Sequence, residues 1–316
     1  MNNIVFGDLY KVPSRNGINR PSAVRGKGFK MINMGELFAN DRIYDIEMEL
    51  VLLNDKEKTN FGVKANDLLF ARQSIIADGA GKCSIVLEVG DKATCFESHI
   101  IRVRLDESKA CSLFYYYFFQ SQIGKGYLST IRQQGVQAGI RGSELNLLKL
   151  PFYNLITQQK IAAILSAYDD LIENNLKRIK LLEEQAQLTY EEWFVRLKFP
   201  GHKTTPINPE TGLPEGWERK TLAEECILTM GQSPKSIYYN NNGEGLPFHQ
   251  GVKDYGYRFP INNTWSTSGN RIAEAKDILF SVRAPVGRLN VAIEKIILGR
   301  GLASIKHKKG LTSFIY

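Results

Sequence analysis

The chain has 316 residues, of which 43% are hydrophobic and 23% are charged. This composition excludes a largely disordered chain and predicts two or three domains of about 100–200 residues each. No apolar run reaches the roughly 18 residues that a membrane-spanning helix needs, and the first residues do not resemble a signal peptide. The four cysteines form no CxxC pair, which argues against a zinc site or a disulfide framework. We therefore expect a cytoplasmic protein with reduced thiols.

The net charge of +8 is unevenly distributed along the chain. Residues 1–151 contain 20 basic and 16 acidic residues, residues 152–201 contain 6 and 7, and residues 202–316 contain 15 and 10. The excess positive charge therefore lies in the two flanks, at +4 and +5, while the middle segment carries −1. Two basic regions around a nearly neutral one suit a polyanionic partner such as nucleic acid.

The first flank, which we assign to a domain of residues 1–150, has a mixed pattern of strands and helices. Short apolar runs rich in β-branched and aromatic residues are typical of strands. Such runs occupy residues 30–34, 67–72, 84–89 and 99–105, and a helical run follows over residues 110–123.

The middle segment, residues 151–200, predicts one long helix. Apolar residues recur in steps of three and four from Ile161 to Leu197, Thr157 is a candidate N-cap, and Gly and Pro are absent from Thr157 to Lys198. A helix of about 40 residues is about 60 Å long, which favours a rod over a core helix of an ordinary bundle. Its apolar stripe is expected to pair with a partner helix through Ile161, Leu165, Tyr168, Ile172, Leu176, Ile179 and Leu182.

The second flank, residues 201–316, repeats the pattern of the first. Residues 64–72 match residues 274–283 with one insertion before the arginine, residues 32–35 match 248–251, and residues 98–103 match 300–305. Three matches in the same order predict a duplicated domain rather than a solenoid. Soon after the last match the sequence stops, so we expect the second copy to lack the distal helices of the first and the chain to be truncated.

Catalytic signatures are weak. Residues 78–84 imitate the end of a phosphate-binding loop, but Ile76 and Cys83 occupy positions where that motif needs Gly and Ser or Thr. A tight turn is the better interpretation. Glu218 and Glu274 each begin a Glu-x-Lys triplet, a spacing found in many metal-dependent nucleases but common by chance. The sequence contains no catalytic constellation, and we predict that the chain is not an enzyme.

Binding signals are stronger in both flanks. Six basic residues and no acidic one lie between Leu9 and Gly35, where several glycines and prolines predict flexible loops suited to phosphate contacts. Residues 131–141 are rich in Gln and Arg, which pair with base edges. The alternatives are a solvated loop and a polar turn. Arg72 and Arg283 follow the matched strand, where a loop begins, although each could instead pair with Asp67 or Asp277.

These considerations give one set of candidate DNA-binding residues. They are Arg15, Arg20, Arg25, Lys27, Lys30, Asn33, Arg72, Gln73, Gln134, Gln137, Arg141, His249, Gln250, Lys253, Arg258, Arg283 and Arg288.

Three stretches carry a family resemblance. Asn33-Met34-Gly35-Glu36-Leu37 together with residues 67–73, the run from Pro151 to Asn175, and Gly212-Leu213-Pro214-Glu215-Gly216-Trp217-Glu218 resemble the specificity subunit of type I restriction–modification systems. The resemblance implies an α+β fold with two α/β target-recognition domains joined by two antiparallel spacer helices. It also implies binding to double-stranded DNA, to two DNA-methyltransferase subunits and to motor–nuclease subunits. S-adenosylmethionine, ATP and Mg would be bound by those partners and not by this chain.

Two recognition domains on a rod predict a split DNA target with an unread gap, because a rod of about 60 Å can space two readers about one duplex turn apart. Two other functions stay open. The chain could be an assembly scaffold or inhibitor that binds methyltransferase subunits without reading DNA. It could also be a stand-alone nuclease that uses Glu218 or Glu274.

Overall fold

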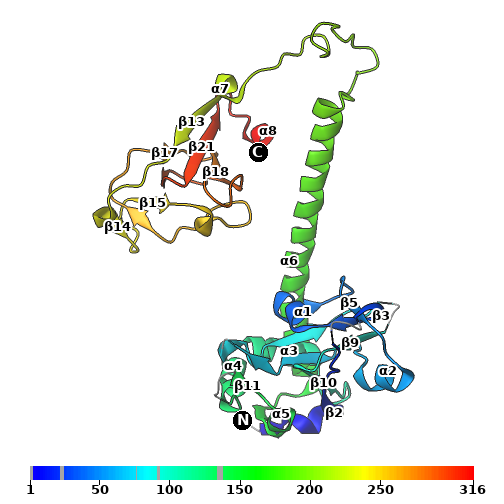
Figure 1. Ribbon diagram of the computed structural model, residues 1–316. Coiled ribbons are helices and arrows are strands. Elements are labelled where there is room, and N and C mark those ends of the chain that lie inside the picture. The colour runs from blue at the N-terminus through cyan, green and yellow to red at the C-terminus, as the bar shows by residue number, and fades with distance from the viewer. Residues whose placement is uncertain (1–2, 22–24, 76, 91–92, 134–137) are drawn as a thin grey trace. The chain divides into compact units, whose positions relative to one another are not determined.

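The computed structural model describes residues 3–21, 25–75, 77–90, 93–133 and 138–316. The chain forms two compact units, Met1–Leu188 and Thr189–Tyr316. The first unit holds a domain of mixed helices and strands together with most of one long helix (Figure 1). The second holds a strand-rich domain.

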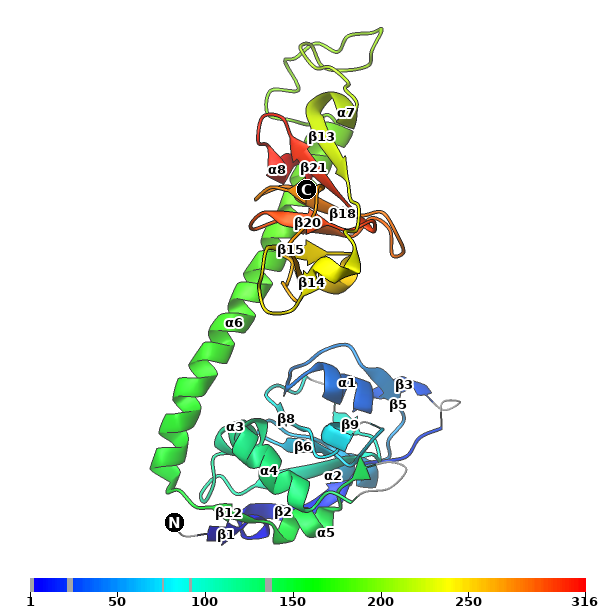
Figure 2. The same ribbon diagram turned by 90° about the vertical axis from the view of Figure 1, so that its left-hand side faces the viewer.

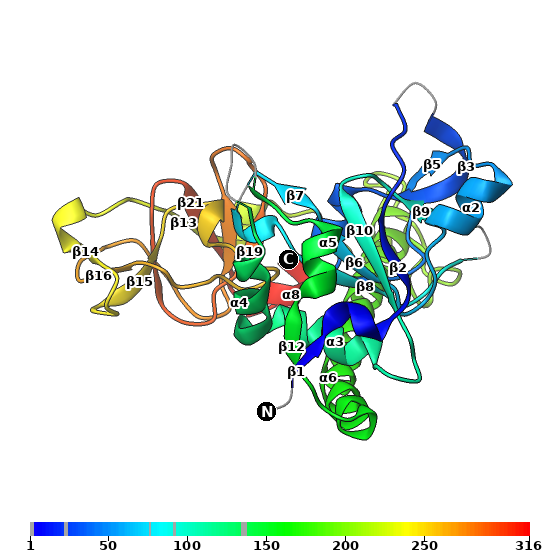
Figure 3. The ribbon, with the colours of Figure 1, turned by 90° about the horizontal axis from the view of Figure 1, so that it is seen from below.

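The first domain is built on a mixed five-stranded sheet. Its strand order is β2-β10-β6-β8-β4, with β10 antiparallel to both β2 and β6, and Figure 3 shows β2, β10, β6 and β8 side by side. The central strands β6 and β10 are buried almost completely, as expected for strands covered on both faces. The bounds are β2 Tyr10–Asn16, β10 Ile100–Leu105, β6 Leu68–Ala71, β8 Cys83–Val86 and β4 Arg42–Ile43.

Smaller sheets and short helices complete this domain. A second sheet has the order β5-β3-β9, in which β3 and β9 are parallel, and two further strand pairs join β1 to β12 and β7 to β11. The strands are β5 Glu49–Val51, β3 Arg25–Ile32, β9 Thr94–Phe96, β1 Asn3–Val5, β12 Lys149–Pro151, β7 Gln73–Ser74 and β11 Ala138–Gly139. The helices are α1 Met34–Ala39, α2 Asp55–Phe61, α3 Ser112–Gln120, α4 Gln122–Thr130 and α5 Gly142–Leu147.

An aromatic cluster forms the centre of the larger core. The Phe119 ring of α3 meets the rings of Phe6 and Phe70 edge-on, each at 5.2 Å between centroids. Edge-to-face pairs of this kind add to the energy of apolar burial. Cys83 and Cys95 are buried in the two different sheets, and all four cysteines of the chain are free thiols.

The predicted long helix is confirmed. Helix α6 runs without a break over Leu155–Tyr190 and continues into a π-helical turn at Glu191–Val195, as the green ribbon in Figures 1 and 2 shows. Its start differs from the prediction. Asn154 is the capping residue, because its side-chain oxygen accepts a hydrogen bond from the backbone N–H of Thr157 at 2.8 Å.

The second domain contains two sheets, with strand orders β13-β21-β18-β19 and β14-β16-β15-β20-β17. The strands of the first are β13 Cys226–Met230, β21 Leu302–His307, β18 Ile278–Ser281 and β19 Leu289–Val291. Those of the second are β14 Tyr239–Asn240, β16 Trp265–Ser266, β15 Leu246–His249, β20 Ile296–Leu298 and β17 Ile272–Ala273. The helices are α7 Leu222–Glu225 and α8 Thr312–Ile315.

The backbone of the second domain repeats that of the first. Strands β13, β21, β18 and β19 have the order and antiparallel pairing of β2, β10, β6 and β8. Asn66 and Lys276, which precede β6 and β18, both adopt a left-handed backbone with φ of 71° and 74°. The Asp that follows each of them accepts a hydrogen bond from the backbone N–H three residues earlier. These shared details support the internal duplication inferred from sequence.

Two of the three sequence matches need a correction of one residue, the first only at its arginine and the second, residues 32–35, along its whole length. The backbone N–H groups of Arg72 and Val282 donate to equivalent carbonyls, those of His99 and Gly301, at 2.7 and 2.9 Å. Arg283 therefore occupies the position of Gln73, not that of Arg72. In the same way, the carbonyls of Ile32 and His249 accept equivalent bonds. Gln250 therefore corresponds to Asn33.

The prediction of flexible loops between Leu9 and Gly35 is wrong. Strands β2 and β3 occupy most of this segment, and the side chains of β2 alternate between half-buried and exposed over most of its length. The glycines and prolines suggested loops because the partner strands, β10, β5 and β9, lie far along the sequence and leave no local signal. In the described part of the chain, no helix is long and apolar enough to cross a membrane.

Candidate nucleic-acid interface

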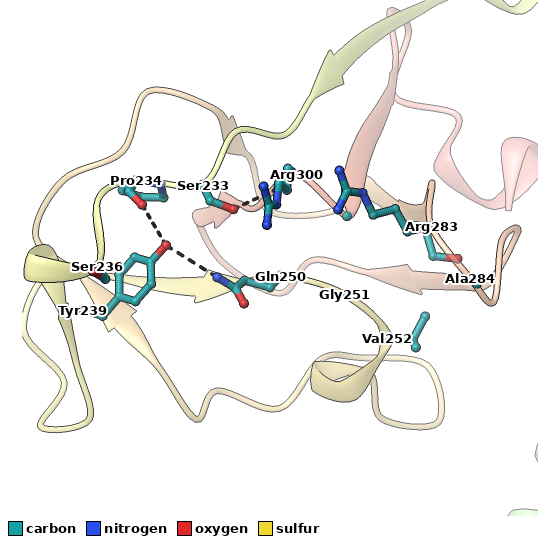
Figure 4. Close-up of a pocket in the computed structure, with 12 residues that line it drawn as sticks. Ser233, Pro234, Ser236, Tyr239, Gln250, Gly251, Val252, Arg283, Ala284 and Arg300 are labelled. Atoms are coloured by element: carbon teal, nitrogen blue, oxygen red, sulfur yellow. Dashed lines mark hydrogen bonds between the residues drawn. The ribbon is translucent and has the colours of Figure 1, made fainter.

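A cavity of about 440 Å³ lies in the second domain. It forms beside the ends of β15, β18 and β21, and Figure 4 shows the side chains that surround it. The lining residues are Ser233, Pro234, Ser236, Tyr239, Gln250, Gly251, Val252, Ser281, Arg283, Ala284, Arg300 and Gly301.

The strands determine where the cavity side chains stand. Gln250 directly follows β15, Arg283 lies two residues after the end of β18, and Arg300 lies two residues before β21. The backbone approaches closely here, since a Cβ atom added at Gly301 would lie 2.2 Å from the carbonyl oxygen of Gln250. A residue without a side chain at position 301 therefore lets two connections meet at the same cavity wall.

Hydrogen bonds hold the polar wall of the cavity in place. The Tyr239 hydroxyl donates to the carbonyl of Pro234 at 2.8 Å and accepts a long bond from the Gln250 amide at 3.5 Å. The Ser233 hydroxyl oxygen accepts from the backbone N–H of Arg300 at 3.2 Å. The wall is therefore ordered before any ligand binds.

Two guanidinium groups line this cavity. Among the described residues, neither Arg283 nor Arg300 has a carboxylate within ion-pair distance, and both residues are exposed. Two arginines beside one cavity produce a local positive potential. Guanidinium groups bind phosphate oxygens and the acceptor edge of guanine. The cavity is therefore suited to an anionic, hydrogen-bond-accepting ligand.

The corresponding edge of the first domain carries the predicted residues Asn33 and Gln73. Asn33 precedes α1 and its amide donates to the Glu49 carboxylate at 3.4 Å. Gln73 lies on β7, opposite Gly139 of β11, beside the half-buried Arg72. Four predicted residues, Asn33, Gln73, Gln250 and Arg283, thus stand at equivalent edges of the two domains.

Three of the predicted cations in the first domain are already ion-paired. The guanidinium of Arg20 pairs with Glu57 at 2.5 Å, that of Arg25 pairs with Glu49 at 2.6 Å, and the Lys30 ammonium pairs with Asp45 at 2.5 Å. These partners lower the positive potential of the predicted basic patch.

The remaining candidates of the first domain are varied. The Arg15 guanidinium lies 5.6 Å from the centre of the Phe61 ring. Lys27 and Arg141 are exposed, and the backbone N–H of Arg141 donates to Glu144. Gln134 and Gln137 lie outside the described residues.

His249 is not available for base contacts. Only 1% of its surface is exposed, and its ring Nε2 lies 2.9 Å from the amide oxygen of Asn262. Burial lowers the pKa of His249, which favours the neutral imidazole at neutral pH. Its partner in the repeat is the buried Ile32, so the polar residue type was misleading.

The three remaining DNA-binding candidates of the second domain, Arg258, Lys253 and Arg288, lie in different surroundings. The Arg258 guanidinium covers the Tyr316 ring at 4.4 Å. Lys253 and Arg288 are exposed.

Each acidic candidate for nuclease chemistry lies beside a lysine ammonium. Glu218 lies 3.6 Å from the ammonium of Lys220, and Glu274 lies 3.3 Å from that of Lys295. Across the described ranges, no three His, Cys, Asp or Glu side chains are grouped so that they could hold a metal ion.

A second cavity, of about 310 Å³, lies in the first domain at the segment that imitates a phosphate-binding loop. Lys82 pairs with Asp41 and Arg132 pairs with Asp78, both at 3.0 Å. Gly81 has a φ of 87°, as a tight turn requires. Because two of its cations are neutralised by carboxylates, this cavity differs from the one in the second domain.

The apolar stripe of α6 is largely exposed. Ile161 packs against the core of the first domain, which differs from its predicted role in a partner contact. The other six predicted residues have exposed fractions between 39% and 65%; they are Leu165, Tyr168, Ile172, Leu176, Ile179 and Leu182.

Of the residues that line the cavity, only Gln250 and Arg283 were predicted; among those missed are Ser233, Tyr239 and Arg300, whose polar groups form its wall. Arg300 could have been found, because the repeat aligned it correctly with Ser98 at the end of a matched strand. No sequence match covered Ser233 or Tyr239, so no signal indicated them.

Comparisons with known proteins agree on one family. A family model described as type I restriction modification DNA specificity domain matches residues 6–184. A protein of Methanocaldococcus jannaschii assigned as the MjaX specificity subunit of a type I restriction enzyme is 34% identical over 214 residues, which are 67% of this chain and 50% of that protein. The specificity subunit of the type I restriction enzyme MjaIX from the same organism is 31% identical over 134 residues, 41% of this chain and 31% of that protein.

A solved structure shows the same fold. The S subunit of a type I restriction–modification system from M. genitalium superimposes with a TM-score of 0.58 at 16% identity, covering 97% of this chain and 72% of that one. The chain spans about half the length of the first of the curated relatives and less of the second.

Proposed function

The chain belongs to the type I restriction–modification DNA specificity domain family, and from this membership we propose that it recognises a split double-stranded DNA sequence. In the proposed complex the chain is a specificity component and not itself an enzyme. It directs DNA-methyltransferase subunits, and with them motor–nuclease subunits, to the target. Those partners bind S-adenosylmethionine, ATP and Mg, and this chain determines which DNA sequence the complex binds.

The observation that carries the proposal is the pair of equivalent edges in the duplicated domains. Asn33 and Gln73 in the first domain correspond to Gln250 and Arg283 in the second. Amide and guanidinium groups pair with adenine and guanine edges in the major groove. Because these side chains differ between the two domains, each domain would read a different half of the target.

The helix α6 supports the split target and the partners. A helix of 36 residues is about 54 Å long, enough to separate two readers by about one duplex turn of 34–36 Å. Its exposed apolar stripe, Leu165 to Leu182, would be buried by a helix of a methyltransferase subunit or of another copy of this chain.

Domain exchange tests whether each domain reads one half of the target. Residues 1–150 are replaced by the equivalent domain of a relative, and the chain is expressed with its methyltransferase subunits. Single-molecule sequencing then reads the methylated target in genomic DNA. We expect one half of the target to change and the other to be retained. A change in both halves would contradict modular reading.

Salt dependence tests the phosphate contacts. Binding of the target duplex by the complex is titrated from about 50 to 200 mM salt, where each phosphate contact contributes about −0.9 to the slope of log K against log salt concentration. We expect a steep slope. A slope near zero would remove the electrostatic part of the proposal.

The scaffold alternative is favoured only by the exposed stripe of α6, since a helix–helix interface needs no DNA. It predicts capture of methyltransferase subunits by the chain with no affinity for any DNA. The same preparation, tested against a random duplex library, separates the two functions.

A further inference from the structure

A polar contact joins the first domain to the middle of α6. The Arg42 guanidinium, at the start of β4, pairs with Asp170 at 2.5 Å and with Glu173 at 3.2 Å. The Tyr44 hydroxyl donates to the same Glu173 carboxylate at 2.6 Å. The Tyr117 hydroxyl of α3 donates to Asp169 at 2.7 Å. Three donors of the domain therefore meet three carboxylates within five residues of one helix.

Arg42 is the centre of this contact. Its side chain is only 8% exposed, although both of its carboxylate partners reach solvent. The guanidinium also lies 5.9 Å from the centre of the Tyr44 ring. A largely desolvated arginine held by two carboxylates and an aromatic face has few alternative positions, so it defines a geometry more narrowly than a surface lysine would.

A second attachment lies nearer to the start of the helix. The Gln158 side chain is fully buried; its oxygen accepts from the backbone N–H of Cys111 at 2.9 Å, and its amide donates to the carbonyl of Tyr153 at 2.7 Å. Ala162, one turn further, is buried in the core of the domain. From Gln158 to Asp170 the helix rises about 18 Å. Two attachments at this separation fix the direction of an axis, which one attachment cannot do.

We propose that Arg42, Tyr44 and Tyr117 are positioning residues that fix the direction in which α6 leaves the first domain. Resting on the proposed function, this contact also sets the number of unread base pairs between the two halves of the target. From Glu173 to Tyr190 the helix extends about 26 Å, so a tilt of about 10° moves its far end by about 4.5 Å. That displacement exceeds the rise of one base pair, about 3.4 Å.

The first experiment measures the direction of the helix without DNA. Spin labels are placed at Ile123→Cys on α4 and Leu181→Cys on α6, both exposed positions of the first unit, in the full chain carrying Cys111→Ser. Pulsed electron resonance then gives the distribution of distances between the labels. We expect a narrow distribution in the parent chain and a distribution at least twice as wide in the triple variant Arg42→Ala, Tyr44→Phe, Tyr117→Phe.

Matched variants separate positioning from folding. Lys180→Ala removes an ion pair with Glu184 on α6 that does not involve the domain, and it should leave the distribution unchanged. Arg42→Lys keeps the charge but cannot hold two carboxylates in a planar fork, and it should give an intermediate width. Circular dichroism confirms that the variants fold. An unchanged width in a folded triple variant would overturn the proposal.

The second experiment measures gap selection in the complex with methyltransferase subunits. Duplexes carry the two half-sites at the natural separation and at separations one and two base pairs longer or shorter. We expect the parent to prefer one separation by at least tenfold and the triple variant to bind neighbouring separations within about threefold of it, with the half-site sequences unchanged.

The outcomes distinguish the two proposals. A wider distance distribution with unaltered gap preference retains the positioning of the helix and overturns its role in gap selection. If the parent complex binds no DNA sequence selectively, the proposed function fails together with gap selection, while the distance measurement still decides whether the contact directs the helix.

Discussion

The two domains share one backbone plan but use their charged side chains differently. In the first domain the Arg104 guanidinium binds both oxygens of the buried Asp67 carboxylate, at 2.7 and 2.6 Å. The strand register places Lys306 where Arg104 stands and Asp277 where Asp67 stands. In the described second domain, Lys306 is exposed and makes no ion pair with Asp277. The same buried aspartate is therefore matched by a cation in one copy only.

The surface cations of the two domains differ in the same way: those compared in the first domain are ion-paired, whereas, among the described residues, those compared in the second are not. Arg20, Arg25 and Lys30 of the first domain are held by carboxylates. Arg283 and Arg300, at the cavity of the second, have no such partner within the described ranges. The comparison teaches that a count of basic residues does not locate a binding surface. We propose that the unpaired cations mark that surface, because carboxylates already neutralise Arg20, Arg25 and Lys30.

The largest expected effect is the loss of the buried ion pair of the first domain. Arg104→Ala leaves the Asp67 carboxylate, which is 0% exposed, without its cation. Removing one partner of a buried pair costs about 3–5 kcal/mol. Urea unfolding followed by far-ultraviolet circular dichroism measures this loss. The matched substitution Lys306→Ala in the second domain should cost less than about 0.5 kcal/mol. Equal losses would break the comparison.

The next effect concerns DNA affinity at the cavity. Arg283→Ala combined with Arg300→Ala should weaken binding of the target by about 2–4 kcal/mol and, if both contact phosphates, lower the salt slope by about 1.8. The control, Arg20→Ala with Arg25→Ala, removes cations that carboxylates already neutralise and should change affinity several-fold less. Fluorescence titrations at three salt concentrations measure both. A larger loss from the control would reverse the assignment of the binding surface.

A smaller loss of stability is expected from a substitution at Gly301, where two backbone segments approach each other at the cavity wall. Gly301→Ala would place a methyl group 2.2 Å from the Gln250 carbonyl oxygen, and crowding of this kind costs about 1–3 kcal/mol. The equivalent position in the first domain is the exposed His99, so His99→Ala should cost almost nothing. Thermal unfolding of the two variants shows whether the close approach belongs to the second domain alone.

The smallest expected effect is a change in stability on substitution of Asp277, the buried aspartate that has no partner equivalent to Arg104 among the described residues. Burial raises the pKa of Asp277 above its ordinary value, although the backbone hydrogen bond from Glu274 opposes the shift. A raised pKa in the folded state means that protonation favours folding, so stability from this group is present at low pH and is lost as pH rises through the raised pKa. Asp277→Asn should therefore stabilise the chain slightly at pH 7, by less than about 1 kcal/mol, and not at pH 3. Melting temperatures at both pH values measure this, and Asp67→Asn, which should destabilise at pH 7, is the matched control.

The features that depend on local pattern could be predicted from sequence. Helix α6 was found because its apolar residues recur every three or four positions over many turns with no Gly or Pro. Strands β6 and β18 were found because an apolar run reappears in both copies after the same kind of turn.

The features that depend on distant partners could not be predicted. The carboxylate that pairs with Arg25 lies 24 residues away on β5, and nothing local to either residue indicates the contact. Arg42 likewise meets Asp170 over a separation of 128 residues. His249 was misassigned because residue type does not reveal which side of a strand faces the core. Sequence alone could therefore name candidate residues in both domains but could not show which of their cations are ion-paired.

The buried cysteine thiols make it possible to measure how often each domain opens. Burial raises the pKa of Cys83, and it raises that of Cys95 to about 12, so at neutral pH almost no thiolate is present in the folded state. Cys226, in β13, is 3% exposed and is the corresponding buried thiol of the second domain. Alkylation of such thiols waits for the surrounding strands to open. Mass spectrometry of the labelled peptides would thus report how often each domain opens separately, in a chain whose duplicated halves a global melting curve would blur together.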